Sequence, residues 1–143
     1  MKLLVLDDSK AFLAVIKRTL ERSGHVCLAA TSWPEAIRLT REAPDAVLVD
    51  VAMPVIDGFE LVKTIRRFWP KLAIILMSGE PGTLYEEQAK NAGADGYIPK
   101  TSIPSSLDAL LAEVTGSSAT KRRARPSTRL ERPDDLRAGP EKS

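Results

Sequence analysis

Short apolar runs of strand length alternate five times with segments of helical period along the chain. The runs are apolar throughout instead of alternating with polar residues, which is typical of strands that are covered on both faces. They lie at about residues 2–7, 26–30, 46–50, 72–77 and 95–99. Parallel strands need right-handed crossovers that place helices on both faces of a sheet. The pattern therefore predicts an α/β fold, a (βα)5 doubly wound five-stranded parallel sheet in a three-layer αβα sandwich.

The segments between the runs have the residues of amphipathic helices. Apolar side chains recur at helical spacing in two clear stripes, Phe12, Leu13, Ile16 and Leu20 in the first and Leu61, Val62, Ile65 and Phe68 in the second. Gly24 and Gly93 stand where the first and fourth helices should end. Ser32-Trp33-Pro34-Glu35 predicts a capping box with a proline in the first turn.

The composition changes at Gly116. Residues 1–116 carry 13 Lys and Arg against 15 Asp and Glu, whereas residues 117–143 carry 8 against 4. The second segment is rich in Arg, Pro and Ser and has no apolar period that could build a core. We predict one domain over residues 1–116 and a disordered basic tail over residues 117–143. The basic run at residues 121–125 could bind phosphates or an acidic partner, but a solvated tail is the favoured interpretation.

The chain has the composition expected of a cytoplasmic protein. Cys27 is its only cysteine, which rules out an internal disulfide and a zinc site built from several cysteines. No apolar stretch approaches the roughly 20 residues that span a bilayer. The predicted domain has a net charge of −2, so we do not expect it to bind nucleic acid.

Charged side chains stand at the ends of the predicted strands. Asp7 and Asp8 follow the first run, Asp50 closes the third, and Lys100 follows the fifth. The carboxyl ends of parallel strands meet at one edge of the sheet, where open α/β folds bind ligands. We therefore expect all four groups to lie close together.

Three neighbouring carboxylates repel one another and need a cation. A hard divalent ion with oxygen ligands, Mg²⁺ above others, suits such a cluster, and Lys100 supplies a fixed positive charge. An acid held ionised between them is an oxygen nucleophile toward phosphorus. Ser78 follows the fourth run and can donate a hydrogen bond to a phosphoryl oxygen. These groups are the ones that phosphoryl transfer requires.

The chain resembles the response-regulator receiver domain of two-component signalling. This family has a flavodoxin-like fold and includes the chemotaxis regulators. The resemblance covers residues 2 to about 115. It rests on four motifs in order: Leu-Asp7-Asp8-Ser, Asp50-Val-Ala-Met53-Pro54-Val-Ile-Asp57-Gly58, Ser78-Gly79 and Gly93-Ala-Asp-Gly-Tyr97-Ile-Pro-Lys100.

The resemblance implies a role for each matching residue. Asp50 would be the phospho-acceptor, and Ser78 and Lys100 would bind the phosphoryl group. Tyr97 would be the aromatic switch that follows Ser78. The implied Mg²⁺ ligands are Asp8, Asp50, the carbonyl of Ala52, and Asp7 through a metal-bound water.

The chain departs from the family at three positions. Thr101 follows the lysine where the family usually has proline, which leaves the geometry of that peptide open. Ala52 and Glu80 occupy the two positions that tune the lifetime of the acyl phosphate in this family.

The resemblance also implies partners and leaves alternatives. A histidine kinase or phosphotransfer protein would donate the phosphoryl group, and the face built from the fourth helix, fifth strand and fifth helix would switch an unknown downstream protein. We expect a monomer or a phosphorylation-dependent dimer and no membrane insertion.

The chain is either a stand-alone receiver or a fragment of a longer regulator. A phosphatase with an aspartyl nucleophile is disfavoured because Ala52 replaces the acid expected two residues beyond Asp50.

Overall fold

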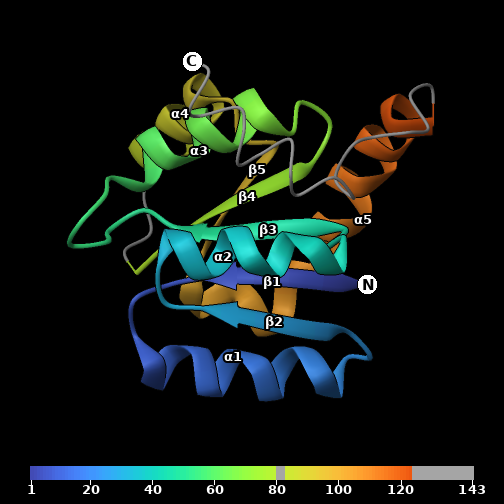
Figure 1. The fold of residues 1–143 in the computed structure, drawn as a ribbon. Coiled ribbons are helices and arrows are strands. Elements are labelled where there is room, and N and C mark those ends of the chain that lie inside the picture. The colour runs from blue at the N-terminus through green and yellow to red at the C-terminus, as the bar shows by residue number, and fades with distance from the viewer. Residues whose placement is uncertain (80–82, 124–143) are drawn as a thin grey trace.

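The computed structural model describes residues 1–79 and 83–123, in which five strands form one parallel sheet in the order β2-β1-β3-β4-β5 (Figure 1). The strands are β1 (Lys2–Leu6), β2 (Val26–Ala30), β3 (Ala46–Asp50), β4 (Ala73–Ser78) and β5 (Gly96–Pro99). The helices are α1 (Lys10–Arg22), α2 (Trp33–Leu39), α3 (Gly58–Phe68), α4 (Thr83–Ala92) and α5 (Ile103–Arg123), with 3-10 turns η1 (Thr40–Glu42) and η2 (Lys100–Ser102). The predicted doubly wound α/β fold is confirmed.

Helices cover both faces of the sheet and make two separate cores (Figure 1). Alternate side chains of each strand point to opposite faces, so Leu3 and Val5 of β1 join the core under α1 and α5. Leu4 and Leu6 join the core under α2, α3 and α4. Every residue of β3 and of β4 is buried, which explains why both strands are apolar up to their last residues, Asp50 and Ser78.

The helix ends agree with the residues found there. Gly24 and Gly93 have φ angles of +89° and +106°, a left-handed conformation that glycine adopts without a Cβ penalty. At the start of α2, Ser32 Oγ accepts a hydrogen bond from the Glu35 N–H at 3.4 Å. The Glu35 carboxylate accepts the N–H of Thr31 at 2.8 Å, one residue before the position that a standard capping box uses.

The last helix is longer than the composition break suggests. We predicted that order ends at Gly116, but the backbone of α5 is helical to Arg123, seven residues further. The rest of the predicted disordered tail, residues 124–143, lies outside the described residues. Over the described part of the chain, none of the helices has the length and apolar character needed to cross a bilayer.

Arg66 of α3 joins three segments at the edge of the sheet opposite the predicted strand-end cluster. Its guanidinium donates to the carbonyl of Gly93 at 3.0 and 3.1 Å, to the carbonyl of Leu72 at 2.7 Å and to the carboxylate of Asp95 at 2.7 Å. The same Asp95 oxygen accepts the N–H of Ile74 at 2.9 Å. One side chain thus fixes the end of α4 and the start of β4 against α3.

We expect Arg66→Ala to lower the free energy of unfolding by about 2–3 kcal/mol, because hydrogen bonds to charged groups contribute about 1.5–3 kcal/mol and partly buried carbonyls lose their donor. Urea denaturation measures the change. The matched control is Arg67→Ala, an exposed arginine of the same helix, which should change stability by less than about 0.5 kcal/mol. Equal losses in the two variants would contradict the role given to Arg66.

Candidate functional site

The register of the sheet brings the predicted strand-end residues to one edge. Leu6 of β1 pairs with Val49 of β3, so Asp7 and Asp50, the next residues, leave the sheet side by side. Chain order changes direction at this pair, since β1 lies between β2 and β3. Open α/β sheets bind ligands at such a point, outside the carboxyl ends of the strands.

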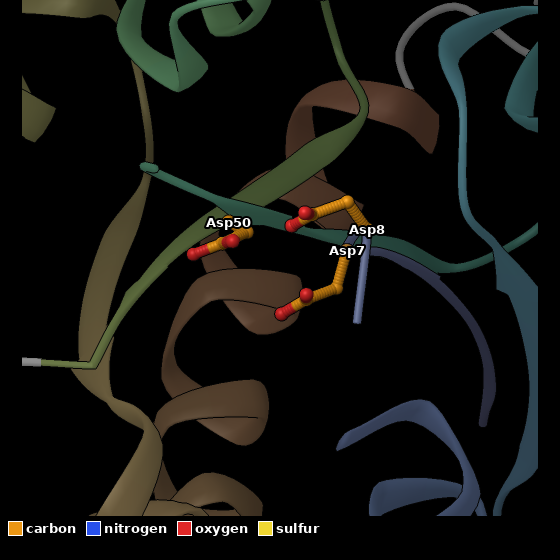
Figure 2. A group of neighbouring side chains, drawn as sticks. All are labelled: Asp7, Asp8 and Asp50. Carbon is orange, nitrogen blue, oxygen red and sulfur yellow. The ribbon is translucent and has the colours of Figure 1, made fainter. Parts of the chain in front are cut away.

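Three carboxylates converge there (Figure 2). Asp7, Asp8 and Asp50 each offer one oxygen, and the three oxygens lie within 4.8 Å of one another. Asp7 is fully buried and Asp50 is 3% exposed, whereas Asp8 is exposed. The predicted meeting of these acids is thus present in the structure, with an open side at Asp8.

Asp7 has a second, local contact. Its Oδ1 accepts the N–H of Ser9 at 2.9 Å, and Ser9 Oγ in turn accepts the N–H of Phe12 at 3.1 Å. Ser9 is therefore the N-cap of α1. The cap is thus the serine that follows the two acids, and neither Asp7 nor Asp8 caps the helix.

Lys100 supplies the positive charge of the cluster. It follows β5 in the 3-10 turn η2, and its Nζ lies 2.5 Å from Asp7 Oδ2 and 3.4 Å from Asp50 Oδ1. The buried Oδ2 of Asp7 nevertheless accepts no hydrogen bond of acceptable geometry from the described residues. One ammonium against three carboxylates leaves the site with excess negative charge.

Burial and charge act together on Asp50. Loss of solvent raises the pKa of Asp50 above its ordinary value of 3.8, and the neighbouring charge of Asp7 raises it further. Lys100 and the N–H of Ala52, 3.4 Å from Asp50 Oδ1, lower this pKa and offset only part of the rise. An additional cation beside Asp50 would favour its ionised form.

The donors present fit a hard divalent cation. Such ions prefer carboxylate and carbonyl oxygens, and this site offers three carboxylates whose oxygens lie within 4.8 Å of one another. Ala52, whose carbonyl was the further predicted ligand, lies two residues after the end of β3, in a loop that is closed by a bridge between Ala52 and Asp57. Histidine and cysteine ligands are absent from this cluster.

Gly58 holds that loop against the end of β3. Its N–H donates to the carbonyl of Val51 at 3.2 Å. A Cβ at Gly58 would lie 2.6 Å from Val51 Cα and closer still to the carbonyl oxygen of Asp50. Only glycine permits this approach, so the Asp57-Gly58 pair fixes the path of the chain beside Asp50.

Ser78 and Tyr97 lie on the next two strands. Ser78 closes β4 with 1% exposure and pairs with Pro99, the residue before Lys100. Tyr97 is half-buried in β5, and its ring centroid lies 6.5 Å from that of Tyr85 in α4. The Tyr85 ring is stacked at 6.3 Å on Phe59 of α3. A row of three aromatic rings thus runs from the loop after Asp50 to β5.

The structure describes some of the positions at which the sequence departs from the receiver-domain family. The Lys100–Thr101 peptide is trans, and Thr101 lies within η2. Glu80 lies outside the described residues. Tyr85, Phe59 and the cap Ser9 were not recognised as parts of this region, because each has an ordinary interpretation as a core or turn residue when the sequence is read alone.

Comparison with known proteins agrees with this geometry. A family model described as the response regulator receiver domain matches residues 3–113. The response regulator MprA of Mycobacterium leprae is 32% identical over 132 residues, which make up 92% of this chain and 55% of that protein. MprA of Mycolicibacterium vanbaalenii is 33% identical over 115 residues, 80% of this chain and 48% of that protein. The chain thus spans about half the length of these curated relatives.

Solved structures show the same similarity. The chemotaxis protein CheY4 of Vibrio cholerae has a TM-score of 0.70 and 30% identity, over 79% of this chain and 97% of that one. A response regulator of Burkholderia pseudomallei, solved with a phosphorylated aspartic acid, a calcium ion and citrate, has a TM-score of 0.68 and 26% identity, over 99% of this chain and 85% of that one. Together with the acid cluster and the lysine at the strand ends, these matches place the chain in the response-regulator receiver-domain family, the signalling switches of two-component systems.

Proposed function

We propose that the chain accepts a phosphoryl group on Asp50 from a phosphohistidine of a histidine kinase or phosphotransfer protein, in a reaction that depends on Mg²⁺. The observation that carries this proposal is the meeting of Asp7, Asp8 and Asp50 with Lys100 at the switch point of the sheet. Few other functions explain a buried carboxylate held beside two more acids and one ammonium.

Each residue has a chemical role in the transfer. A carboxylate oxygen of Asp50 forms a new bond to phosphorus while the bond from phosphorus to the donor nitrogen breaks, and the donor histidine leaves. Lys100 stabilises charge on the transferring oxygens, and Ser78 donates a hydrogen bond to one of them. Phosphoryl transfer depends mainly on such positioning and charge stabilisation.

Asp8, Asp50 and the carbonyl of Ala52 would hold Mg²⁺, with Asp7 acting through a bound water. When bound, the ion neutralises charge on the phosphoryl oxygens and on the acid cluster. The three converging carboxylates, which one ammonium neutralises only in part, support this set. The calcium ion and phosphorylated aspartic acid in the related Burkholderia pseudomallei structure support both the cation and the acceptor.

Phosphorylation would then bias partner binding through the face made by α4, β5 and α5. Tyr97, Lys90, Leu110 and Glu113 line a hollow on this face, and the aromatic row through Tyr85 leads to it from the phosphorylation site. A switch from 1:99 to 99:1 requires about 5.5 kcal/mol of preference for one state. The downstream partner would be a protein that recognises this face, with a phosphorylation-dependent dimer as one form of recognition.

The chain acts either as a stand-alone cytoplasmic receiver or as part of a longer regulator. Because it spans about half of its curated relatives, the longer form has specific support. Residues 1–116 carry every group assigned to the reaction, so we further propose that residues 117–143 affect partner choice and not phosphorylation.

The direct test uses acetyl phosphate as a small donor. In the presence of Mg²⁺, one modification should be trapped by borohydride and located at Asp50 by mass spectrometry. Asp50→Asn should abolish it, because an amide oxygen is a poor nucleophile. Glu60→Gln is the matched control, since it makes the same change from acid to amide at an exposed residue of α3 outside the cluster and should keep the label. Labelling that persists in Asp50→Asn would refute the acceptor assignment.

Asp50 should also make stability depend on pH. Its pKa is raised in the folded protein, so the unfolded chain loses the proton first and the folded state loses stability as pH rises. This stability is fully present below the ordinary pKa of 3.8 and lost as pH rises through the folded value. In chelator, Asp50→Asn should therefore melt at a higher temperature than wild type at pH 7. The difference in melting temperature between the two proteins should shrink toward pH 4. A constant difference between pH 4 and pH 7 would contradict a raised pKa of Asp50.

A further prediction concerns the metal ligands. Asp8→Ala should weaken Mg²⁺ binding by more than about tenfold, since loss even of groups that orient a ligand costs about 10- to 100-fold. The variant should remain folded and be as stable as wild type or slightly more so, because carboxylate repulsion is relieved. Calorimetry measures the affinity, with Glu113→Ala as an exposed acid of α5 for control. Unchanged affinity in folded Asp8→Ala would remove the metal site.

A further inference from the structure

The ammonium of Lys100 has a third neighbour that the acid cluster does not explain. Its Nζ lies over the ring of Phe12, 4.4 Å from the ring centroid. The same nitrogen is 2.5 Å from Asp7 Oδ2 and 3.4 Å from Asp50 Oδ1. The ammonium is therefore in contact with two carboxylates and with the negative face of an aromatic ring, which attracts cations.

The Phe12 ring is held in place by α1 and by the core beneath that helix. Phe12 lies in the first turn of α1, and its N–H is capped by Ser9 Oγ at 3.1 Å. The side chain packs against the core that includes Leu13 and Ile16, which are 6% and 3% exposed. Because α1 and its core anchor the ring, its position does not depend on the charge state of Asp50.

A neutral aromatic ring can hold the Lys100 ammonium at less electrostatic cost than another acid. Lysine has a long flexible side chain and loses rotamer freedom when its end is fixed. A fourth carboxylate could fix it, but would add repulsion to a cluster that already has three and would compete for the cation. The ring attracts the ammonium through its quadrupole and carries no net charge. It also offers no oxygen ligand to a metal.

We infer that Phe12 is a positioning residue that holds the Lys100 ammonium toward Asp50 during phosphoryl transfer. The inference rests on the proposed function, because Lys100 matters to the reaction only if Asp50 is the acceptor. When Asp50 gains the phosphoryl group, its own attraction for the lysine changes, whereas the contact with Phe12 stays. The ring thus keeps the ammonium within reach of the transferring oxygens in both states.

The test compares three variants of the full chain in Mg²⁺-dependent labelling by acetyl phosphate. Phe12→Leu removes the ring but keeps an apolar side chain. Phe12→Tyr keeps an aromatic face. Phe68→Leu makes the same chemical change at a partly buried phenylalanine in α3, away from Lys100. The maximal rate constant and the half-saturating Mg²⁺ concentration are measured for each, together with the melting temperature.

Phe12→Leu should lower the maximal rate constant by about 3- to 30-fold, the range that measured cation–π energies imply. The half-saturating Mg²⁺ concentration should stay within about twofold, because the ring is not a ligand. Phe12→Tyr and Phe68→Leu should both keep the wild-type rate constant. A purely structural role for Phe12 would instead lower the melting temperature without this selective loss of rate, and that result overturns the inference.

A second measurement needs no phosphoryl-transfer reaction. In the wild-type protein without Mg²⁺ or phosphodonor, the Lys100 Hε protons should resonate upfield of their usual position, because they lie near a ring face. Phe12→Leu should remove this shift. An unshifted Lys100 in wild type, or a rate constant unchanged by Phe12→Leu, overturns the inference. Failure of wild type to label Asp50 at all would instead refute the proposed function, while the Lys100 shift still reports the contact.

Discussion

The repulsion among Asp7, Asp8 and Asp50 is the constraint around which the other features of the site are arranged. Their oxygens lie within 4.8 Å of one another, and two like charges 4 Å apart repel by about 4 kcal/mol at an effective dielectric of about 20. Lys100 offsets part of this and leaves net negative charge. Burial of Asp50 increases the cost of its ionised form and raises its pKa. A site in this condition gains stability from a cation that offsets the excess negative charge.

The fold tolerates this repulsion because the strands and loops around the acid cluster are firmly packed. β3 and β4 are buried along their whole length, and Arg66 fixes the far edge of the sheet with hydrogen bonds from one guanidinium. Near the acids, Gly58 lets the chain turn back against β3, and Ser9 caps the start of α1. A rigid scaffold can hold unfavourable charge at a small site because the cost is small beside the burial of two cores.

Two aromatic arrangements extend the site in different directions. Phe12 lies under the ammonium of Lys100 and connects it to the core beneath α1. On the other face, the row from Phe59 through Tyr85 to Tyr97 connects the loop after Asp50 to β5. In the proposed mechanism, the first arrangement would hold the ammonium that stabilises the transferring oxygens. The second would offer packed contacts through which a change at Asp50 reaches the face of α4, β5 and α5.

The sequence by itself determined the order of strands and helices and the acids at the strand ends, because periodicity and strand-end position are local properties. The motifs and the family resemblance that they carry then predicted Asp50 as the phospho-acceptor and Lys100 as a phosphoryl-binding residue. Only the tertiary structure decided that Phe12 contacts Lys100, since a phenylalanine in a helical stripe looks like any core residue until a loop 88 positions later is folded over it. The same holds for the end of α5, where composition marked Gly116 but the helix runs to Arg123. Contacts between distant segments depend on register and packing, which no local pattern encodes.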